Sequence, residues 1–172
     1  MRRPSASHSG FSLVELMVVV GILAIIAGLA APSFSAMVLN SRVRAGAEGV
    51  LTGLQFARAE AIRRNTNVSF VLGSGTGWTV RTVSPDAVIQ TRGSREAGSN
   101  LNVTSTNGQT TVTFTPVGSV AGYNAGTALT RVTVAPGSTT TGVDNIQIDV
   151  FAGGQIRMCN TAVTTTDDPR KC

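Results

Sequence analysis

The sequence predicts an α+β fold in which one long N-terminal α-helix packs on antiparallel β-sheets. Three observations carry this prediction. An apolar run extends from Phe11 to Ala31, and an amphipathic helical pattern then continues over residues 32–65. The remainder, residues 66–172, alternates short β-branched runs with clusters of Gly, Ser, Asn and Pro, as strands and tight turns do.

The composition fits one modest globular domain behind the apolar run. The 172 residues carry 14 Lys and Arg against 9 Asp and Glu, a formal net charge of +5. A charge of this size is not by itself a signature of nucleic-acid binding. Aromatic residues make up only 5% of the chain and there are 19 glycines, which is typical of a small sheet domain rich in turns.

The apolar run is long enough to cross a membrane, because a helix rises about 1.5 Å per residue and the hydrocarbon core is about 30 Å thick. Glu15 is the only charged residue in it. A carboxylate at the bilayer centre costs on the order of 2.5 to 3.5 kcal/mol, so Glu15 either needs a partner or lies at the headgroup level facing water.

Two further features shape the expected helix. Small residues recur at helical spacing, which either lets helices approach closely or reflects the ordinary abundance of Gly and Ala in membrane helices; they are Gly21, Ala24, Ala27, Gly28 and Ala31. Pro32 lacks an amide donor and should kink the helix.

Residues 32–65 continue the helix with one apolar stripe, which we expect to pack on a sheet. The stripe comprises Val43, Ala47, Val50, Leu51, Leu54, Ala57 and Ala61. Charged residues occupy the other faces, namely Arg42, Arg44, Glu48, Arg58, Glu60, Arg63 and Arg64.

The expected strands are separated by turn signals that fit antiparallel hairpins, such as the glycine-rich stretch 73–77. The strands cover residues 67–72, 78–83, 87–91, 110–115, 129–135, 145–150 and 154–158. The middle of this region, about residues 92–136, carries nothing diagnostic.

The first fifteen residues resemble the prepilin signature of type IV pilins and type II secretion pseudopilins. A polar leader of residues 1–10 ends in Gly10, Phe11 follows, and Glu15 stands at the fifth place after the junction. The resemblance implies that a prepilin peptidase cleaves after Gly10 and that Phe11 is then N-methylated. It also implies that Glu15 pairs with the terminal amine of a neighbouring subunit, the state in which two costly charges compensate each other.

A secretory signal peptide cleaved near Ala31 is the competing interpretation of the N-terminus. Glu15 would then lie inside the apolar region, that region would be unusually long, and Pro32 would crowd the cleavage site. The sequence favours the prepilin interpretation.

Residues 54–65, together with Gly77-Trp78-Thr79-Val80 after the first expected strand, resemble the GspH/FimT branch of this family. The resemblance implies a minor pilin or pseudopilin at or near the tip of a type IV pilus or a type II secretion pseudopilus, where it helps prime assembly. Other pilin subunits, the prepilin peptidase and the inner membrane are the implied partners. The chain would cross the inner membrane once, with residues 66–172 in the periplasm, before it enters the filament.

No enzyme, cofactor or metal site is predicted. The single histidine, His8, lies in the expected leader, so histidine-dependent catalytic and metal sites would be absent from the mature chain. The glycine-rich stretch 73–77 has no following Gly-Lys-Ser/Thr, which favours a hairpin over a phosphate loop. The pair Asp167-Asp168 has no third ligand at calcium-loop spacing and fits a solvated tail.

The only two cysteines, Cys159 and Cys172, would meet an oxidising periplasm. We expect a structural disulfide that fastens the polar tail to the last strand and constrains the unfolded chain by roughly 3 kcal/mol. A redox role is the alternative, which the long spacing disfavours.

Some FimT-like proteins capture DNA for natural transformation through a Gly-Arg-x-Arg motif, and the resemblance extends weakly to it. The matching stretch is Gly154-Gln155-Ile156-Arg157, in which Gln155 replaces the first arginine. Arg170 and Lys171, brought near Arg157 by the disulfide, could supply further phosphate contacts. The alternative is that all three are ordinary surface charges.

Overall fold

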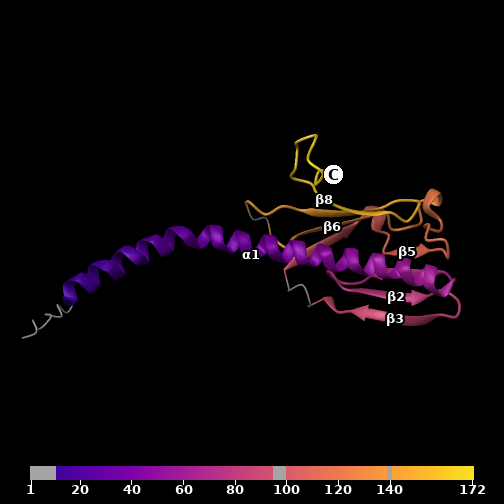
Figure 1. The fold of residues 1–172 in the computed structure, drawn as a ribbon, viewed down its shortest axis with the longest axis horizontal. Helices are drawn as coiled ribbons and strands as arrows, with labels where there is room; N and C mark the ends of the chain where they lie inside the picture. Colours follow the sequence, from indigo (N-terminus) through magenta and orange to yellow (C-terminus); the bar gives the residue numbers. More distant parts are fainter. Residues whose placement is uncertain (1–10, 95–99, 139–140) are drawn as a thin grey trace, which may run out of the picture. The chain divides into compact units, whose positions relative to one another are not determined.

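The computed structural model describes residues 11–94, 100–138 and 141–172 (Figure 1). They belong to two compact units, Met1–Ser35 and Ala36–Cys172, which are treated separately below. One helix, α1 (Leu13–Arg64), contributes to both units. Gly10 and the rest of the expected leader lie outside the described residues, as do the side chains of residues 30–33, so the kink expected at Pro32 stays a prediction.

In the first unit, α1 is apolar all round, and every side chain from Phe11 to Leu29 is exposed. A helix of this kind needs lipid or other helices around it. No single described helix is long and apolar enough to cross a membrane, although Leu13–Leu29 and Phe34–Arg64 have the necessary length and composition when taken together.

In the second unit, α1 buries the apolar stripe that its spacing predicts. The fully buried members are Val43, Ala47, Val50, Leu54, Ala57 and Ala61, and Leu51 is half-buried beside them. The helix ends at Arg64, and the positive φ of 51° at the following Asn65 allows the Thr66 amide to reach back to the Ala61 carbonyl oxygen at 3.2 Å. Arg63 and Arg64 occupy the last turn, where the helix dipole favours positive charge.

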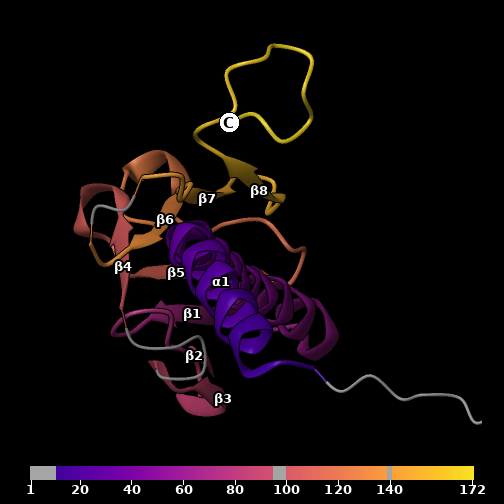
Figure 2. The same ribbon diagram turned by 90° about the vertical axis from the view of Figure 1, so that its left-hand side faces the viewer.

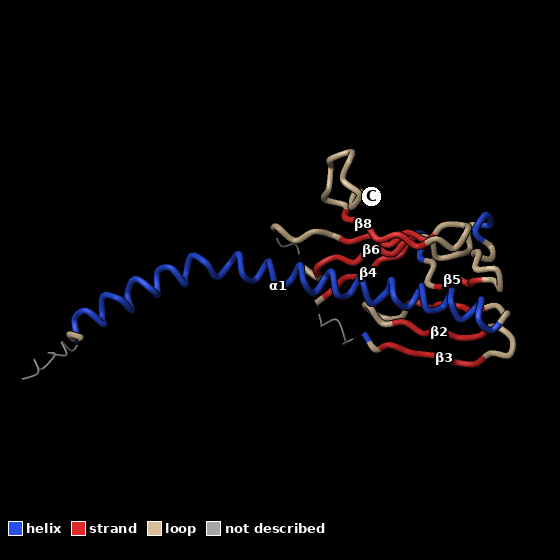
Figure 3. Tube along the Cα trace, in the orientation of Figure 1, coloured by secondary structure: helices blue, strands red, loops and turns tan. Residues whose placement is uncertain are grey.

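Two four-stranded antiparallel sheets cover this part of the helix, and Figure 2 shows them following one another beside it. The first has the order β3-β2-β1-β5 and the second the order β4-β6-β7-β8. The strands are β1 (Val68–Leu72), β2 (Trp78–Thr82), β3 (Ala87–Arg92), β4 (Leu101–Ser105), β5 (Thr111–Phe114), β6 (Arg131–Pro136), β7 (Ile146–Val150) and β8 (Ile156–Asn160). The short 3-10 helices η2 (Thr106–Gly108) and η3 (Tyr123–Ala125) lie in the connections, and Figure 3 shows that the segment after β8 is mostly loop.

The core lies between the buried stripe of α1 and the inner faces of both sheets. Phe70 and Trp78 stand on neighbouring strands with ring centroids 5.9 Å apart. Gly53 makes room for them on the helix, because a Cβ there would lie 2.5 Å from Trp78 Cε2 and 2.9 Å from Phe70 Cε2. The α+β fold predicted from the sequence is therefore confirmed.

The structure departs from the sequence pattern at two places. Strand β4 is absent from the predicted strands, because its apolar residues Leu101 and Val103 are only half-buried and the other residues of the strand are polar. Glu60, one of the charged residues outside the apolar stripe, is only 8% exposed. It can be buried because Arg63 donates to both of its carboxylate oxygens, at 2.8 and 2.7 Å, and Arg64 donates a further hydrogen bond.

Candidate functional site

The start of α1 has the geometry of a capped helix with an acidic first turn. Ser12 Oγ accepts a hydrogen bond from the Glu15 amide at 3.2 Å, in the Ser-x-x-Glu spacing of a capping box. Glu15 and the preceding Phe11 are both exposed. The carboxylate is thus stabilised by the N-terminal end of the helix dipole while it stays accessible to a positive group of another chain.

The disulfide between Cys159 and Cys172 is present, with Cα atoms 5.0 Å apart. It closes the segment after β8 into a loop that lies beside the strand end. The Asn160 amide donates to the Arg170 carbonyl oxygen at 2.7 Å, and Asn160 and Lys171 form an isolated parallel bridge. The predicted pairing of the two cysteines is confirmed.

The same loop brings the backbone of Lys171 to the side chain of Arg157. Arg157 Nη2 donates to the Lys171 carbonyl oxygen at 2.6 Å and lies 3.4 Å from the Pro169 carbonyl oxygen, so part of its guanidinium fastens the tail. Within the described residues, Arg157 and Lys171 form no ion pair with a carboxylate.

Arg170 differs from its two neighbours because it pairs with Asp168 at 2.7 Å. The side chain and backbone amide of Arg170 both donate to Asp168, and together they lower the pKa of this carboxyl to about 2. Asp168 is therefore not a free acidic group of a solvated tail. It neutralises one of the three cations expected to contact DNA.

Arg58 occupies a position that the sequence pattern did not reveal. Its Nε donates to the Gly118 carbonyl oxygen at 3.0 Å, and Nη2 lies 3.5 Å from the Gly153 carbonyl oxygen. The helix is thus joined to two turns, one after β5 and one before β8. The glycines of these turns were the one sequence signal that could have marked the site. Gly118 and Gly154 both have positive φ, 81° and 75°, a conformation that favours glycine.

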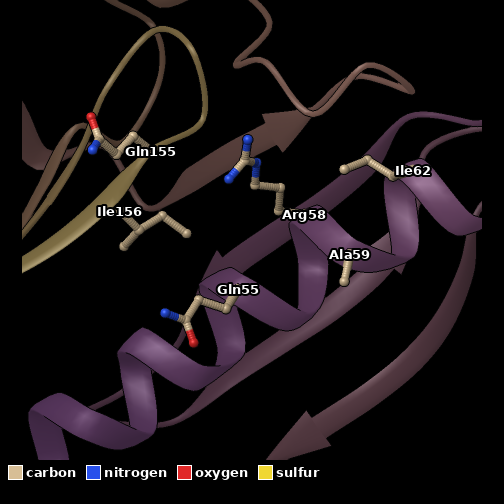
Figure 4. A pocket seen from close by; sticks show the side chains of 6 residues that line it. All are labelled: Gln55, Arg58, Ala59, Ile62, Gln155 and Ile156. Atoms are coloured by element: carbon tan, nitrogen blue, oxygen red, sulfur yellow. The ribbon is translucent and has the colours of Figure 1, made fainter.

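Figure 4 shows Arg58 between the start of β8 and Ile62 of the helix. The groove around it has a volume of about 310 Å³ and is lined by Gln55, Arg58, Ala59, Ile62, Gln155 and Ile156. The lining of the groove combines apolar side chains with one positively charged residue, Arg58.

The described residues contain no cluster of three or more His, Cys, Asp or Glu side chains able to hold a metal ion. The glycine-rich stretch 73–77 connects the antiparallel strands β1 and β2, with the Gly73 amide donating to the Gly77 carbonyl oxygen at 2.8 Å. It is the hairpin that the sequence predicted.

Comparison with known families decides what kind of protein carries these features. Residues 46–168 match the model described as type II transport protein GspH. The chain belongs to this family. Residues 5–31, which include Gly10, Phe11 and Glu15, match the prokaryotic N-terminal methylation motif. The family consists of minor pilins and pseudopilins, which are structural subunits, and the motif implies anchoring in the inner membrane through the N-terminal helix.

Solved structures show the same fold. Two crystal forms of the type IV minor pilin FimU of Pseudomonas aeruginosa resemble this chain, with TM-scores of 0.55 and 0.51 at 20% and 19% identity. The matches cover 69% and 67% of this chain and 88% and 90% of the FimU chains. No curated protein matches the sequence.

Proposed function

We propose that this chain is a minor pilin or pseudopilin that enters the filament at or near its tip and helps prime assembly of a type IV pilus or a type II secretion pseudopilus. The observation that carries the proposal is the exposed Glu15 in the capped first turn of a helix that is apolar all round. Membership of the family and the likeness to FimU support it.

In this proposal the prepilin peptidase cleaves after Gly10, and the new ammonium group of Phe11 carries the methyl group. Lipid or neighbouring helices surround the apolar part of α1. An ammonium and a carboxylate that enter such surroundings together avoid the desolvation penalty that either would meet alone. Glu15 of one subunit therefore pairs with the terminal ammonium of the next, and the pair fixes the axial position of the incoming helix.

The Glu15→Ala variant tests the role of this carboxylate. We expect the variant to accumulate in the membrane and to be lost from sheared filaments, because the buried ammonium loses its partner. Glu48→Ala is the matched control, since Glu48 is an exposed glutamate on the same helix, paired with Arg44 at 3.0 Å. Normal incorporation of the Glu15 variant would refute the assigned role, provided that its thermal unfolding is unchanged.

DNA capture is the second candidate function. The observation that favours it is the contact of the Arg157 side chain with the backbone of Lys171, with no carboxylate paired to either residue among those described. Such cations can contact successive phosphates, although Gln155 stands where the motif has its first arginine.

A gel-shift salt series with the full chain in detergent tests this second function. Each lost phosphate contact lowers the slope of log K against log salt by about 0.9 for duplex DNA, so Arg157→Ala should flatten the slope. Arg42→Ala is the control, because Arg42 is an exposed arginine elsewhere on α1. An absence of binding at low salt, or equal slopes for the wild type and the Arg157 variant, would exclude this site.

A further inference from the structure

The position of Arg58 in the groove is fixed by close backbone packing next to it. A Cβ at Gly154 would lie 1.8 Å from the Gly118 carbonyl oxygen and 3.0 Å from Arg58 Nε. A Cβ at Gly118 would lie 2.9 Å from Ile62 Cδ1. Glycine at position 154 lets the two turns meet beside the guanidinium, and the positive φ of both Gly118 and Gly154 also favours glycine. The cation is thus held in place by backbone carbonyl groups from two separate turns.

The charge in the groove has no counterpart among the described residues. None of the six lining residues is acidic, and no described carboxylate forms an ion pair with Arg58. A guanidinium has five N–H donors, and only Nε and Nη2 reach acceptors in the described part of the chain. The remaining donors favour an acceptor from outside the subunit, and a carboxylate binds a guanidinium most strongly.

Apolar and amide groups flank this cation. Ile62 is 51% exposed although it lies in the domain that holds the core, and Ile156 is half-buried on the opposite wall. The exposed amides of Gln55 and Gln155 complete the walls, and Figure 4 shows all four side chains around Arg58. A ligand that fits must combine one negative charge with aliphatic groups and hydrogen-bonding groups.

Strand β8, whose start lines the groove, is an edge strand. It pairs with β7 on one side, and in the described residues the other side is bridged only at Asn160, by Lys171. An edge strand offers backbone donors and acceptors to an extended chain. A peptide supplies aliphatic side chains, backbone amides and a carboxylate together, which a free anion does not.

We propose that the groove between α1 and the start of β8 binds an extended segment of a neighbouring subunit, with a carboxylate of that segment on Arg58 and aliphatic side chains on Ile62 and Ile156. The identity of the partner as a subunit rests on the proposed function. The chemistry of the site rests only on the groove.

Peptide binding to the full chain in detergent micelles, followed through the Arg58 Nε–H signal after 15N-arginine labelling, tests the proposal. The probe is the tripeptide Val-Glu-Val blocked at both ends, and the control peptide has Gln in place of Glu. We expect a saturable shift with the Glu peptide and at least about tenfold weaker binding of the Gln peptide. Equal binding of the two peptides, or no saturable shift, would overturn the proposal.

Two variants keep the test independent of folding. Gln155→Glu places a carboxylate in the groove at an exposed position and should abolish peptide binding by occupying Arg58 from within. Gln90→Glu makes the same change on β3, at an exposed position of the other sheet, and should bind as the wild type does. Retained binding by the Gln155 variant contradicts the site.

Titration with a DNA oligonucleotide completes the binding experiment. If DNA and not the Glu peptide shifts the Arg58 signal in a saturable way, the groove is a nucleic-acid site and the peptide proposal is wrong. The Glu15→Ala variant should bind the Glu peptide normally. Failure of filament incorporation and failure of this groove are therefore separate results.

Discussion

The indole Nε1 of Trp78 donates a hydrogen bond to the carbonyl oxygen of Gly49 at 3.0 Å. This bond joins strand β2 to the middle of α1 inside the core, and Trp78 is 4% exposed. A buried indole N–H without an acceptor would be costly. The tryptophan therefore fixes both the position of β2 along the helix and its distance from the helix, and Gly53 leaves the space that the indole ring occupies.

Gly53→Ala should destabilise the domain by about 1–3 kcal/mol, since the new methyl group collides with the Trp78 and Phe70 rings, which cannot move without disrupting the core. The better helix propensity of alanine offsets up to about 1 kcal/mol of this loss. Gly49→Ala is the matched control. A Cβ there meets the guanidinium end of the Arg92 side chain, which can shift more easily than two core rings, so we expect a smaller loss of stability than for Gly53→Ala. Urea unfolding of both variants measures the difference, and equal stabilities would contradict the packing described for Gly53.

Reduction of the Cys159–Cys172 disulfide should lower the free energy of unfolding by about 3 kcal/mol, because it releases a loop with a sequence separation of 13. Paired substitution of both cysteines by alanine should have the same effect. Thermal unfolding with and without reductant measures it. The double variant should no longer respond to reductant, and non-reducing mass analysis of exported wild-type protein should show no free thiol. Two free thiols in that analysis would contradict the bond.

Glu60 should make stability depend on pH in the acid range. Hydrogen bonds from Arg63, and then from Arg64, lower its pKa from 4.5 to about 2. Between pH 4.5 and pH 2 the unfolded chain binds a proton at Glu60 more readily than the folded chain does. The contribution of Glu60 to the free energy of unfolding is therefore complete above about pH 4.5 and is lost as the pH drops toward 2. The wild type should therefore be more stable than Glu60→Gln at pH 7, and the difference should shrink toward pH 2.

Denaturant unfolding of both proteins across this pH range gives the comparison. Glu48→Gln serves as the control, because Glu48 is 53% exposed in its pair with Arg44 and such pairs contribute at most about 1 kcal/mol. If the difference in the free energy of unfolding between the wild type and Glu60→Gln stays constant from pH 7 to pH 2, the ionised Glu60 does not stabilise the fold.

The sequence predicted those parts of the fold that arise from a regular pattern. The spacing of Val43, Ala47 and Val50 at intervals of three and four places them on one helical face whatever they pack against, and all three are fully buried. Strand β4 escaped prediction because it is a half-buried edge strand, for which the alternation of apolar and polar residues is weak.

The candidate sites divide in the same way. The spacing of Gly10, Phe11 and Glu15 is local and could be found in the sequence. The role of Arg58 depends on carbonyl groups 60 and 95 residues away, at Gly118 and Gly153, so no local pattern contains it. In the sequence Glu60 looks like any other charged residue of a helix, and only the structure shows that it is buried.

The covalent ring formed by residues 159–172 also determines what happens to the chain when it is cut. Residues 164–167 are exposed in a loop, where proteases act most readily. A single cleavage between the two cysteines opens the ring but releases no fragment, because the disulfide still joins Cys172 to the buried Cys159. The bridge thus lets the domain keep its basic residues Arg170 and Lys171 after a single cut in this loop.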